Sequence, residues 1–432
     1  MSLRISVVLV LFFFLPAAFS YPGRAYYWLT KLRAGEIVSA FHVLLLPTII
    51  LSILLLIIRS QKKFHINKSE VGILSVLILW TLAATLSFIF NFSIEDVQIN
   101  YISAYFSSFL VYLALKNFPL TKNQINLIFL ALSLGSLFPL ISGLIAYYHQ
   151  WGIPNASTLI LSFYSLPTMT EYHQATFGNV GNTAAFLTLI SPPLFMLSID
   201  KKRSLILRSW FWICLLLVIL NWLIIQSRTA FFVLFIAALF VLYFKSPKKS
   251  ILIIIALIFG LEVFKTSGIF NFFSERLSVA IKLDRQGDNS VDERLAAMQQ
   301  GWNIFLNNWE VGVGPGASQY YNSFSTAHQF IVQQGAELGV LGLLASSLIV
   351  IIVFYRLFKI LVIGSSNALN KERFIFIIGP ASYLLYGMLA NMALNIGVVN
   401  TWIVLMAALL ALVDFKPKPN QRDEVSVNLN SL

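Results

Sequence analysis

Two arginines and one histidine stand apart in this strongly apolar chain, because each lies close to a long hydrophobic run. Arg228 is the only charge in "QSRTA" (226–230), Arg294 follows "SVDE" (290–293), and His328 lies in "STAHQF" (325–330). A guanidinium group binds phosphate oxygens through paired N–H donors, and an imidazole with an ordinary pKa can accept a proton at neutral pH. These residue types therefore indicate chemistry that combines anion binding with proton transfer.

Each of the three residues also has a purely structural interpretation. Arg228 can snorkel to a membrane surface, and His328 can be an ordinary polar loop residue. Arg294 can form a surface ion pair with Asp292 or Glu293. What favours an anion site at Arg294 is its place near a predicted helix N-terminus, where free amides and the helix dipole attract phosphate.

The composition of the chain indicates an integral membrane protein. Hydrophobic residues make up 58% of the 432 residues and charged residues only 11%, whereas a soluble domain has roughly a quarter charged residues. The net charge of +12 arises mainly from short segments between apolar runs, a pattern typical of membrane topology. This pattern excludes a water-soluble globule and argues against nucleic-acid binding. The single cysteine, Cys214, lies in an apolar run and can form no disulfide within the chain.

Apolar stretches that approach or exceed the length of a membrane span recur along the chain, and spans of this kind form helices. Their approximate bounds are 5–21, 37–58, 71–92, 99–116, 124–148, 183–199, 206–225, 229–245, 250–265, 338–358, 374–393 and 397–415. We therefore predict an all-α polytopic membrane protein with about twelve transmembrane helices. Most of the 30 Lys and Arg residues fall in alternate connections, which places both termini in the cytoplasm.

This topology gives an integral membrane domain over residues 1–415 and a polar cytoplasmic tail over residues 416–432. Two long connections, 149–182 and 266–337, are predicted periplasmic loops. The second is a large helical periplasmic loop between spans nine and ten. Residues 1–20 resemble a signal peptide, so cleavage of the first segment is an alternative to its retention as a span.

The second loop contains a clear helix signal. In "SVDE" the Ser290 hydroxyl and the Glu293 carboxylate can satisfy each other's free amides as a capping box. Apolar residues then recur at helical spacing, which predicts an amphipathic helix; they are Leu295, Met298, Trp302 and Phe305. The following "GVGPG" (312–316) lacks the Lys-Ser/Thr of a phosphate-binding loop and is predicted to form a rigid corner.

Three segments carry a family resemblance: "SRTA" (227–230), "ERLAAMQQGWNIFLNNWEVGVGPG" (293–316) and "AHQFIVQQGAELGVLG" (327–342). In this order they resemble the O-antigen ligase/polymerase superfamily of bacterial envelope enzymes. The resemblance implies a metal-independent glycosyltransferase without a cofactor, which takes a glycan from undecaprenyl diphosphate. It also implies that Arg228 and Arg294 bind the donor diphosphate and that His328 is the catalytic base. Many members have asparagine where this chain has Gln329.

The resemblance leaves the acceptor open. The favoured expectation is an inverting O-antigen ligase of the bacterial inner membrane, with a periplasmic active site and a lipid A-core sugar as acceptor. An O-antigen polymerase or an O-linked protein glycosyltransferase would use the same donor. The expected partners are this donor, a glycan acceptor and membrane lipids. A transporter is the alternative from another class, but the predicted spans hold almost no charges apart from Glu262.

Overall fold

The computed structural model of the chain describes six main segments, and all regular structure within them is helical. The described residues are 68–91, parts of 101–144, 180–225, 227–250 without 249, 290–323, 327–364 and 368–390. The predicted spans 5–21, 37–58, 250–265 and 397–415 lie essentially outside these residues, and spans 99–116 and 124–148 are described only in part. The all-α class is confirmed for the described part of the chain, whereas the number of twelve spans stays a prediction.

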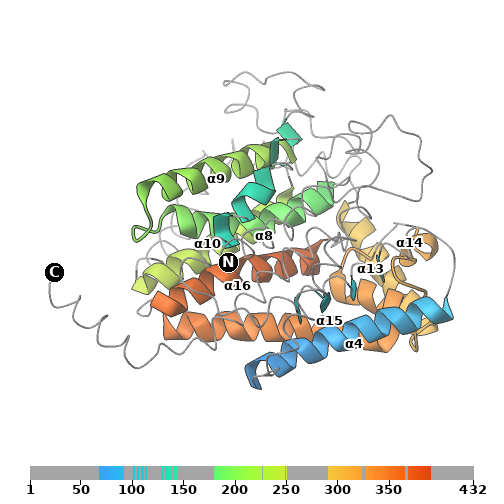
Figure 1. Cartoon of the computed structure of the whole chain (residues 1–432). Coiled ribbons are helices and arrows are strands. Elements are labelled where there is room, and N and C mark those ends of the chain that lie inside the picture. Colours follow the sequence, from blue (N-terminus) through green and yellow to red (C-terminus); the bar gives the residue numbers. More distant parts are fainter. Residues whose placement is uncertain are drawn as a thin grey trace, which may run out of the picture.

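Most of the described helices run side by side as a bundle, and α13 (Ser290–Asn307) and α14 (Ser318–Tyr321) lie together at one end of it (Figure 1). The helices of the bundle are α4 (Lys68–Phe90), α8 (Val180–Ser198), α9 (Leu205–Ile225), α10 (Arg228–Lys245), α15 (Phe330–Ile363) and α16 (Ala368–Leu389). We call the end that holds α13 and α14, with its connecting turns, the cap.

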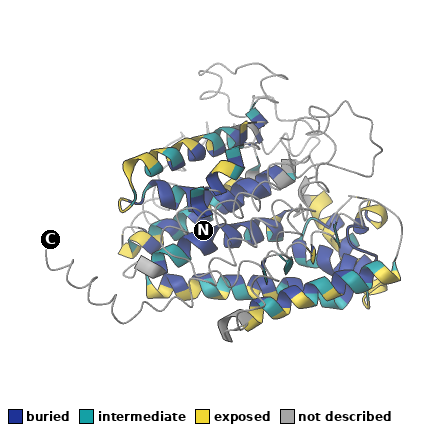
Figure 2. Ribbon diagram, viewed as in Figure 1, coloured by how far each residue is buried: buried dark blue, intermediate teal, exposed yellow. Residues whose placement is uncertain are grey.

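Three of the described helices are long and apolar enough to cross a membrane: Val71–Phe90, Leu205–Trp222 and Phe330–Ile363. The apolar helices Thr183–Ser198 and Thr229–Lys245 are shorter. Exposed residues lie mainly on the outward faces of α4, α9 and α15, and buried residues lie between the helices (Figure 2). Large apolar side chains on these outward faces, such as Ile206, Ile351 and Val362, are mostly exposed, as expected for surfaces that contact lipid rather than water.

Helix α16 lies at the centre of the described bundle and packs against α8, α10 and α15. Gly379 allows close contact with α8, because a Cβ atom there would lie 2.3 Å from the Leu189 carbonyl oxygen. On its other side, Phe374 stacks on Phe244 of α10 with ring centroids 4.1 Å apart. Small residues and stacked rings thus bring together helices that are far apart in the sequence.

Helix α15 begins at Phe330, earlier than the predicted span 338–358, and it is broken at Gly339. The backbone of Gly339 has φ 68° and ψ −157°, a conformation that is essentially restricted to glycine. A Cβ atom at this position would lie 2.6 Å from the Glu310 carbonyl oxygen. The short first part of α15 therefore belongs to the cap, and the long second part belongs to the bundle.

The backbone groups freed by this break are bonded to the cap and to α4. The Val313 amide donates to the Ala336 carbonyl at 3.0 Å, and the Gly314 amide donates to the Glu337 carbonyl at 3.1 Å. The Val340 amide donates to the Trp309 carbonyl at 2.7 Å. The segment "GVGPG" thus forms the predicted corner, with Gly312, Gly314 and Gly316 all at positive φ.

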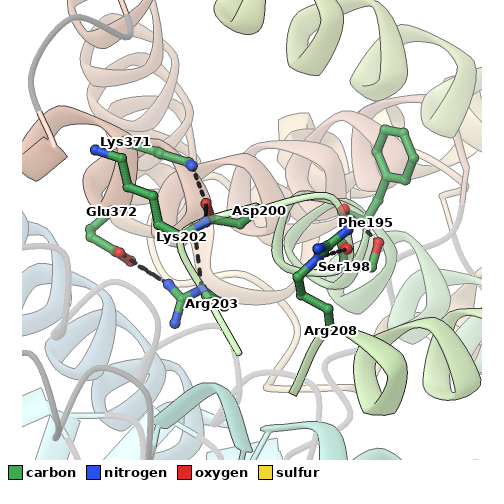
Figure 3. A network of polar contacts seen from close by, with 8 residues as sticks. All are labelled: Phe195, Ser198, Asp200, Lys202, Arg203, Arg208, Lys371 and Glu372. Carbon is green, nitrogen blue, oxygen red and sulfur yellow. Dashed lines mark hydrogen bonds and ion pairs between the residues drawn. The ribbon is translucent and has the colours of Figure 1, made fainter. Parts of the chain in front are cut away.

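An ion-pair network closes the opposite end of the bundle (Figure 3). Asp200, in the turn after α8, accepts a hydrogen bond from Lys371 of α16 and one from the Lys202 amide at 3.1 Å. Arg203 pairs with Asp200 at 3.3 Å and with Glu372 at 3.0 Å. Burial alone would raise the pKa of the Asp200 carboxyl, but these hydrogen bonds and the adjacent cations lower it. The network fixes the α8–α9 turn against the start of α16.

Candidate functional site

The first turn of α10 forms one side of the candidate site, and it begins at Arg228. Ser227 is the N-cap of this helix, and its hydroxyl accepts a hydrogen bond from the Ala230 amide at 3.3 Å. The other amides of the first turn have no partner within their own helix, so the turn attracts anions. Arg228 therefore begins a helix whose end carries partial positive charge.

Helix α13 brings Arg294 to this same turn. The Arg294 guanidinium donates a hydrogen bond to the Thr229 hydroxyl at 3.3 Å, and the Arg294 side chain is otherwise exposed. Because Thr229 follows Arg228 directly in the chain, two of the three residues selected from the sequence lie at one helix N-terminus. The alternative interpretation, an ion pair of Arg294 with Asp292 or Glu293, does not occur among the ion pairs of the described residues.

His328 lies two residues before the start of α15 and within electrostatic range of Arg294. Its half-buried side chain stands on a residue with φ 50°, a left-handed conformation that is uncommon for residues other than glycine. Burial and the positive charge of Arg294 lower the pKa of the His328 imidazole, while Glu293 partly opposes the shift. The imidazole is therefore neutral at neutral pH, which is the form that can accept a proton.

Gln329 fixes His328 at the start of α15. Its side-chain oxygen accepts a hydrogen bond from the Val332 amide at 2.6 Å, so Gln329 is the N-cap of the helix. Ala327, on the other side of the histidine, packs against α13, where a Cβ atom on Gly301 would lie only 2.5 Å from the Ala327 Cβ atom. Gly301 therefore permits α13, which carries Arg294, to approach the segment that carries His328.

Glu337 holds the cap against the bundle from a fully buried position in α15. Its carboxylate accepts hydrogen bonds from the Ser318 hydroxyl at 2.7 Å, the Gln333 side-chain amide at 2.9 Å and the Gly316 amide at 3.0 Å. Its own carbonyl accepts a further bond from Ser87 of α4 at 2.6 Å. Glu337 thus joins α4, α14, α15 and the corner, and it supports the site without lying in it.

Tyr386 of α16 is a residue near the site that sequence reasoning missed. Its side chain is 3% exposed, its hydroxyl is hydrogen-bonded to Ser227, and Arg294 lies close enough to act on it electrostatically. The sequence carries no signal for this contact, because Tyr386 lies within an apolar run far from Ser227 in the chain. The structure therefore adds a buried hydroxyl behind the first turn of α10.

The arrangement brings the Arg294 guanidinium and a neutral imidazole to the helix N-terminus that begins at Arg228. Such a site can hold an anionic group between the Arg294 guanidinium and main-chain amides, while the imidazole accepts a proton from a second molecule nearby. The described residues contain no group of three or more His, Cys, Asp or Glu side chains that could share a metal ion.

Residues 213–347 match a family model described as O-antigen ligase. This part of the chain belongs to the O-antigen ligase superfamily. The matched segment includes Arg228, Arg294 and His328, together with the corner 312–316 and the break in α15. No curated protein matches the chain significantly. Membership of the O-antigen ligase superfamily, together with the apolar helices, indicates a membrane protein with a glycan-transfer role in O-antigen or lipopolysaccharide processing.

Proposed function

We propose that the chain is an O-antigen ligase that transfers a glycan from undecaprenyl diphosphate to a hydroxyl of a lipid A-core sugar on the periplasmic face of the inner membrane. The observation that carries the proposal is the contact of Arg294 with Thr229, the residue that follows Arg228 in the chain, together with the electrostatic effect of Arg294 on His328. The family match supports the reaction class, and the geometry supports a site for a diphosphate next to a base.

In the proposed reaction, Arg228 and Arg294 bind the diphosphate of the donor. Negative charge grows on that diphosphate as its bond to the anomeric carbon breaks, and the two guanidinium groups stabilise the charge. One such electrostatic contact is typically worth about 10²–10³ in rate. The helix N-terminus at Arg228 adds main-chain donors for the same oxygens.

His328 acts on the other substrate. Its neutral imidazole accepts the proton of the acceptor hydroxyl, whose oxygen attacks the anomeric carbon as undecaprenyl diphosphate leaves. A positioned base contributes about 10²–10⁴ in rate. A single displacement of this kind inverts the configuration at the anomeric carbon. Because guanidinium groups neutralise the leaving diphosphate, the mechanism requires no divalent cation.

The proposal is tested with purified protein in lipid nanodiscs, a lipid-linked glycan donor and a lipid A-core acceptor. His328→Asn should abolish transfer, because asparagine tolerates the left-handed backbone of this position but provides no base. Arg228→Lys and Arg294→Lys should both be impaired, because lysine cannot make the bidentate contact. Asn303→Ala, on an exposed face of α13, is the matched control and should be fully active.

Two further measurements separate the proposed function from its alternatives. Transfer that is lost in excess EDTA and restored by magnesium would contradict the metal-independent mechanism.

A deletion strain should accumulate long lipid-linked glycan and carry bare lipid A-core. If its core instead bears one repeat unit, the protein is a polymerase, and if core glycosylation is normal, the acceptor is something else. Normal transfer by the His328 variant would overturn the assignment of the base.

A further inference from the structure

Helix α13 has three distinct faces. One face packs on the rest of the cap through Ala297, Gly301, Ile304 and Phe305, all of which are buried. A second face is polar and mostly exposed, with Asp292, Gln299, Asn303 and Asn307. The third face is apolar and exposed, and we call it the α13 apolar stripe; it consists of Leu295, Met298, Trp302 and Leu306, with exposed fractions of 55%, 37%, 42% and 54%.

The α13 apolar stripe is a continuous surface and not a scatter of single residues. With about 100° between successive residues of a helix, its four side chains fall within an arc of about 80°. Trp309, in the turn that follows the helix, adds a further aromatic side chain that is 54% exposed. The sequence predicted an amphipathic helix, and of the four apolar residues that indicated it, only Phe305 is buried. Burial against the protein therefore does not explain why the other three are apolar.

The stripe begins beside the lipid-facing surface of the bundle. Arg294, which directly precedes Leu295, contacts Thr229 in the first turn of α10. The next residues of α10, Phe231 and Phe232, are 64% and 53% exposed. The exposed apolar surface of α10 is thus adjacent to the start of the stripe.

We infer that α13 lies in the headgroup layer of the membrane at the cap end of the bundle, with the α13 apolar stripe in contact with the acyl chains of phospholipids. A helix with an apolar face that carries tryptophan and a separate polar face is typical of this position. Glu293 lies on the side of the helix opposite the centre of the stripe, and Asp292 lies on the polar face, about 80° from that centre. Binding of a glycan to the stripe is a less suitable alternative, because aliphatic side chains such as Leu295 and Leu306 offer a sugar neither a ring to stack on nor a hydrogen bond.

If Arg294 binds the donor as in the proposed function, the depth of α13 in the membrane also determines where Arg294 meets the donor. Arg294 immediately precedes the stripe, so contact of the stripe with lipid holds its guanidinium at the depth of the headgroups. The diphosphate of a lipid-linked donor lies at the same depth. Helix α13 therefore sets the height at which Arg294 meets its ligand, while the bundle sets the height of Arg228.

The inference is tested by measuring the depth of single labels in the full chain. The only native cysteine, Cys214, is buried and is replaced by alanine. A nitroxide is then attached at Trp302→Cys in the stripe or at Asn303→Cys on the polar face, in nanodiscs of phosphatidylethanolamine and phosphatidylglycerol. We expect the label at 302 to be several-fold more accessible to oxygen than to a water-soluble nickel chelate. The label at 303 should show the reverse preference.

Equal exposure of both labels to the nickel chelate would overturn the inference, because the stripe would then face water. Protection of the label at 302 from both oxygen and nickel would also overturn it, because another part of a protein would then cover the stripe. Leu306→Cys and Asn307→Cys form a second pair with the same expected contrast if a Trp302 variant fails to insert. Lipid contact without any glycan transfer would leave the inference standing and remove the proposed function, so the two can fail separately.

Discussion

The guanidinium of Arg294 lies 3.3 Å from the hydroxyl of Thr229, although 65 positions separate the two residues in the chain. This contact joins the helix of the large loop to the first turn of a bundle helix, directly after Arg228. It is the point at which the residues selected from the sequence become neighbours in space. We therefore expect the orientation of Arg294 to depend on Thr229.

Thr229→Val should weaken the binding of a lipid-linked donor while it leaves the protein folded. Valine keeps the shape of threonine and removes the oxygen that accepts from Arg294. The net value of such a hydrogen bond predicts an increase of about two- to tenfold in the KM for the donor, with a smaller change in kcat. Thr81→Val is the matched control, because the Thr81 hydroxyl donates to the Leu77 carbonyl of its own helix and therefore links no two helices through this bond. Equal effects of the two substitutions would contradict the prediction.

The pH dependence of transfer should change when a charged residue near His328 is replaced. The base must be neutral, so transfer falls as the pH drops through the pKa of His328. Glu293 raises that pKa, and Glu293→Gln should therefore move the acid limb of the kcat/KM profile to lower pH. Asp292→Asn removes an exposed carboxylate one residue away and serves as the control. A shift of the limb to higher pH in the Glu293 variant would show that another group limits the rate.

The glycine at the break in α15 should be more sensitive to substitution by alanine than the glycine that caps the end of the same helix. Gly339 and Gly364 have similar backbone angles, with φ 68° and 75° and ψ −157° and −172°. Alanine at either position costs about 1–3 kcal/mol of strain. At Gly339 a Cβ atom would also lie 2.6 Å from a carbonyl oxygen, whereas at Gly364 it would meet nothing within 4 Å. Thermal unfolding in nanodiscs should therefore show a clearly larger loss of stability for Gly339→Ala than for Gly364→Ala.

The ion-pair network at the other end of the bundle should contribute to stability. Asp200→Asn leaves the cations of Lys371 and Arg203 without their shared partner, and the loss of one member of a buried pair costs about 3–5 kcal/mol. We expect the lower end of that range, because the Lys371 side chain is 20% exposed. Glu372→Gln should cost less, because the Glu372 carboxylate is 23% exposed and, among the described residues, forms an ion pair with Arg203 alone. Unfolding by denaturant measures the loss of stability in each variant. A larger loss for Glu372→Gln than for Asp200→Asn would contradict this ranking.

The pH dependence of this contribution has a defined sign. The pKa of Asp200 is lower in the folded protein than its ordinary value. Its stabilising effect is therefore fully present above the pKa of the unfolded chain, and it is lost as the pH falls through the folded pKa. The difference in stability between the native protein and Asp200→Asn should accordingly narrow in acid.

Local patterns predicted much of the fold. Apolar runs identified α4, α8, α9 and α10 to within three residues, and α16 with a start six residues too late; the capping box identified the start of α13 at Ser290. These signals are local, because hydropathy and capping depend on residues within a few turns. The start of α15 was missed, since "FIVQQGAELG" is too polar to resemble a span. Its helix is stabilised by the Gln329 cap and by the bonds of Glu337.

The candidate site was predictable as a set of residues but not as an arrangement. Arg228, Arg294 and His328 could be selected because charged or titratable groups are rare beside apolar runs. Their proximity depends on Gly301 against Ala327 and on the corner against the break in α15. Such contacts connect segments far apart in the chain, and no local pattern encodes them. Their chemical roles stay predictions until the substitutions are measured.

The bonds that cross the break in α15 constrain the order in which the protein can assemble. The amides of Val313 and Gly314 satisfy the carbonyls of Ala336 and Glu337, so neither partner is complete alone. If α15 entered the bilayer with the cap unfolded, it would carry open peptide groups at the edge of the hydrocarbon. The cap therefore cannot be excised and grafted as an independent module. Its folding and the insertion of the tenth predicted span are one cooperative event.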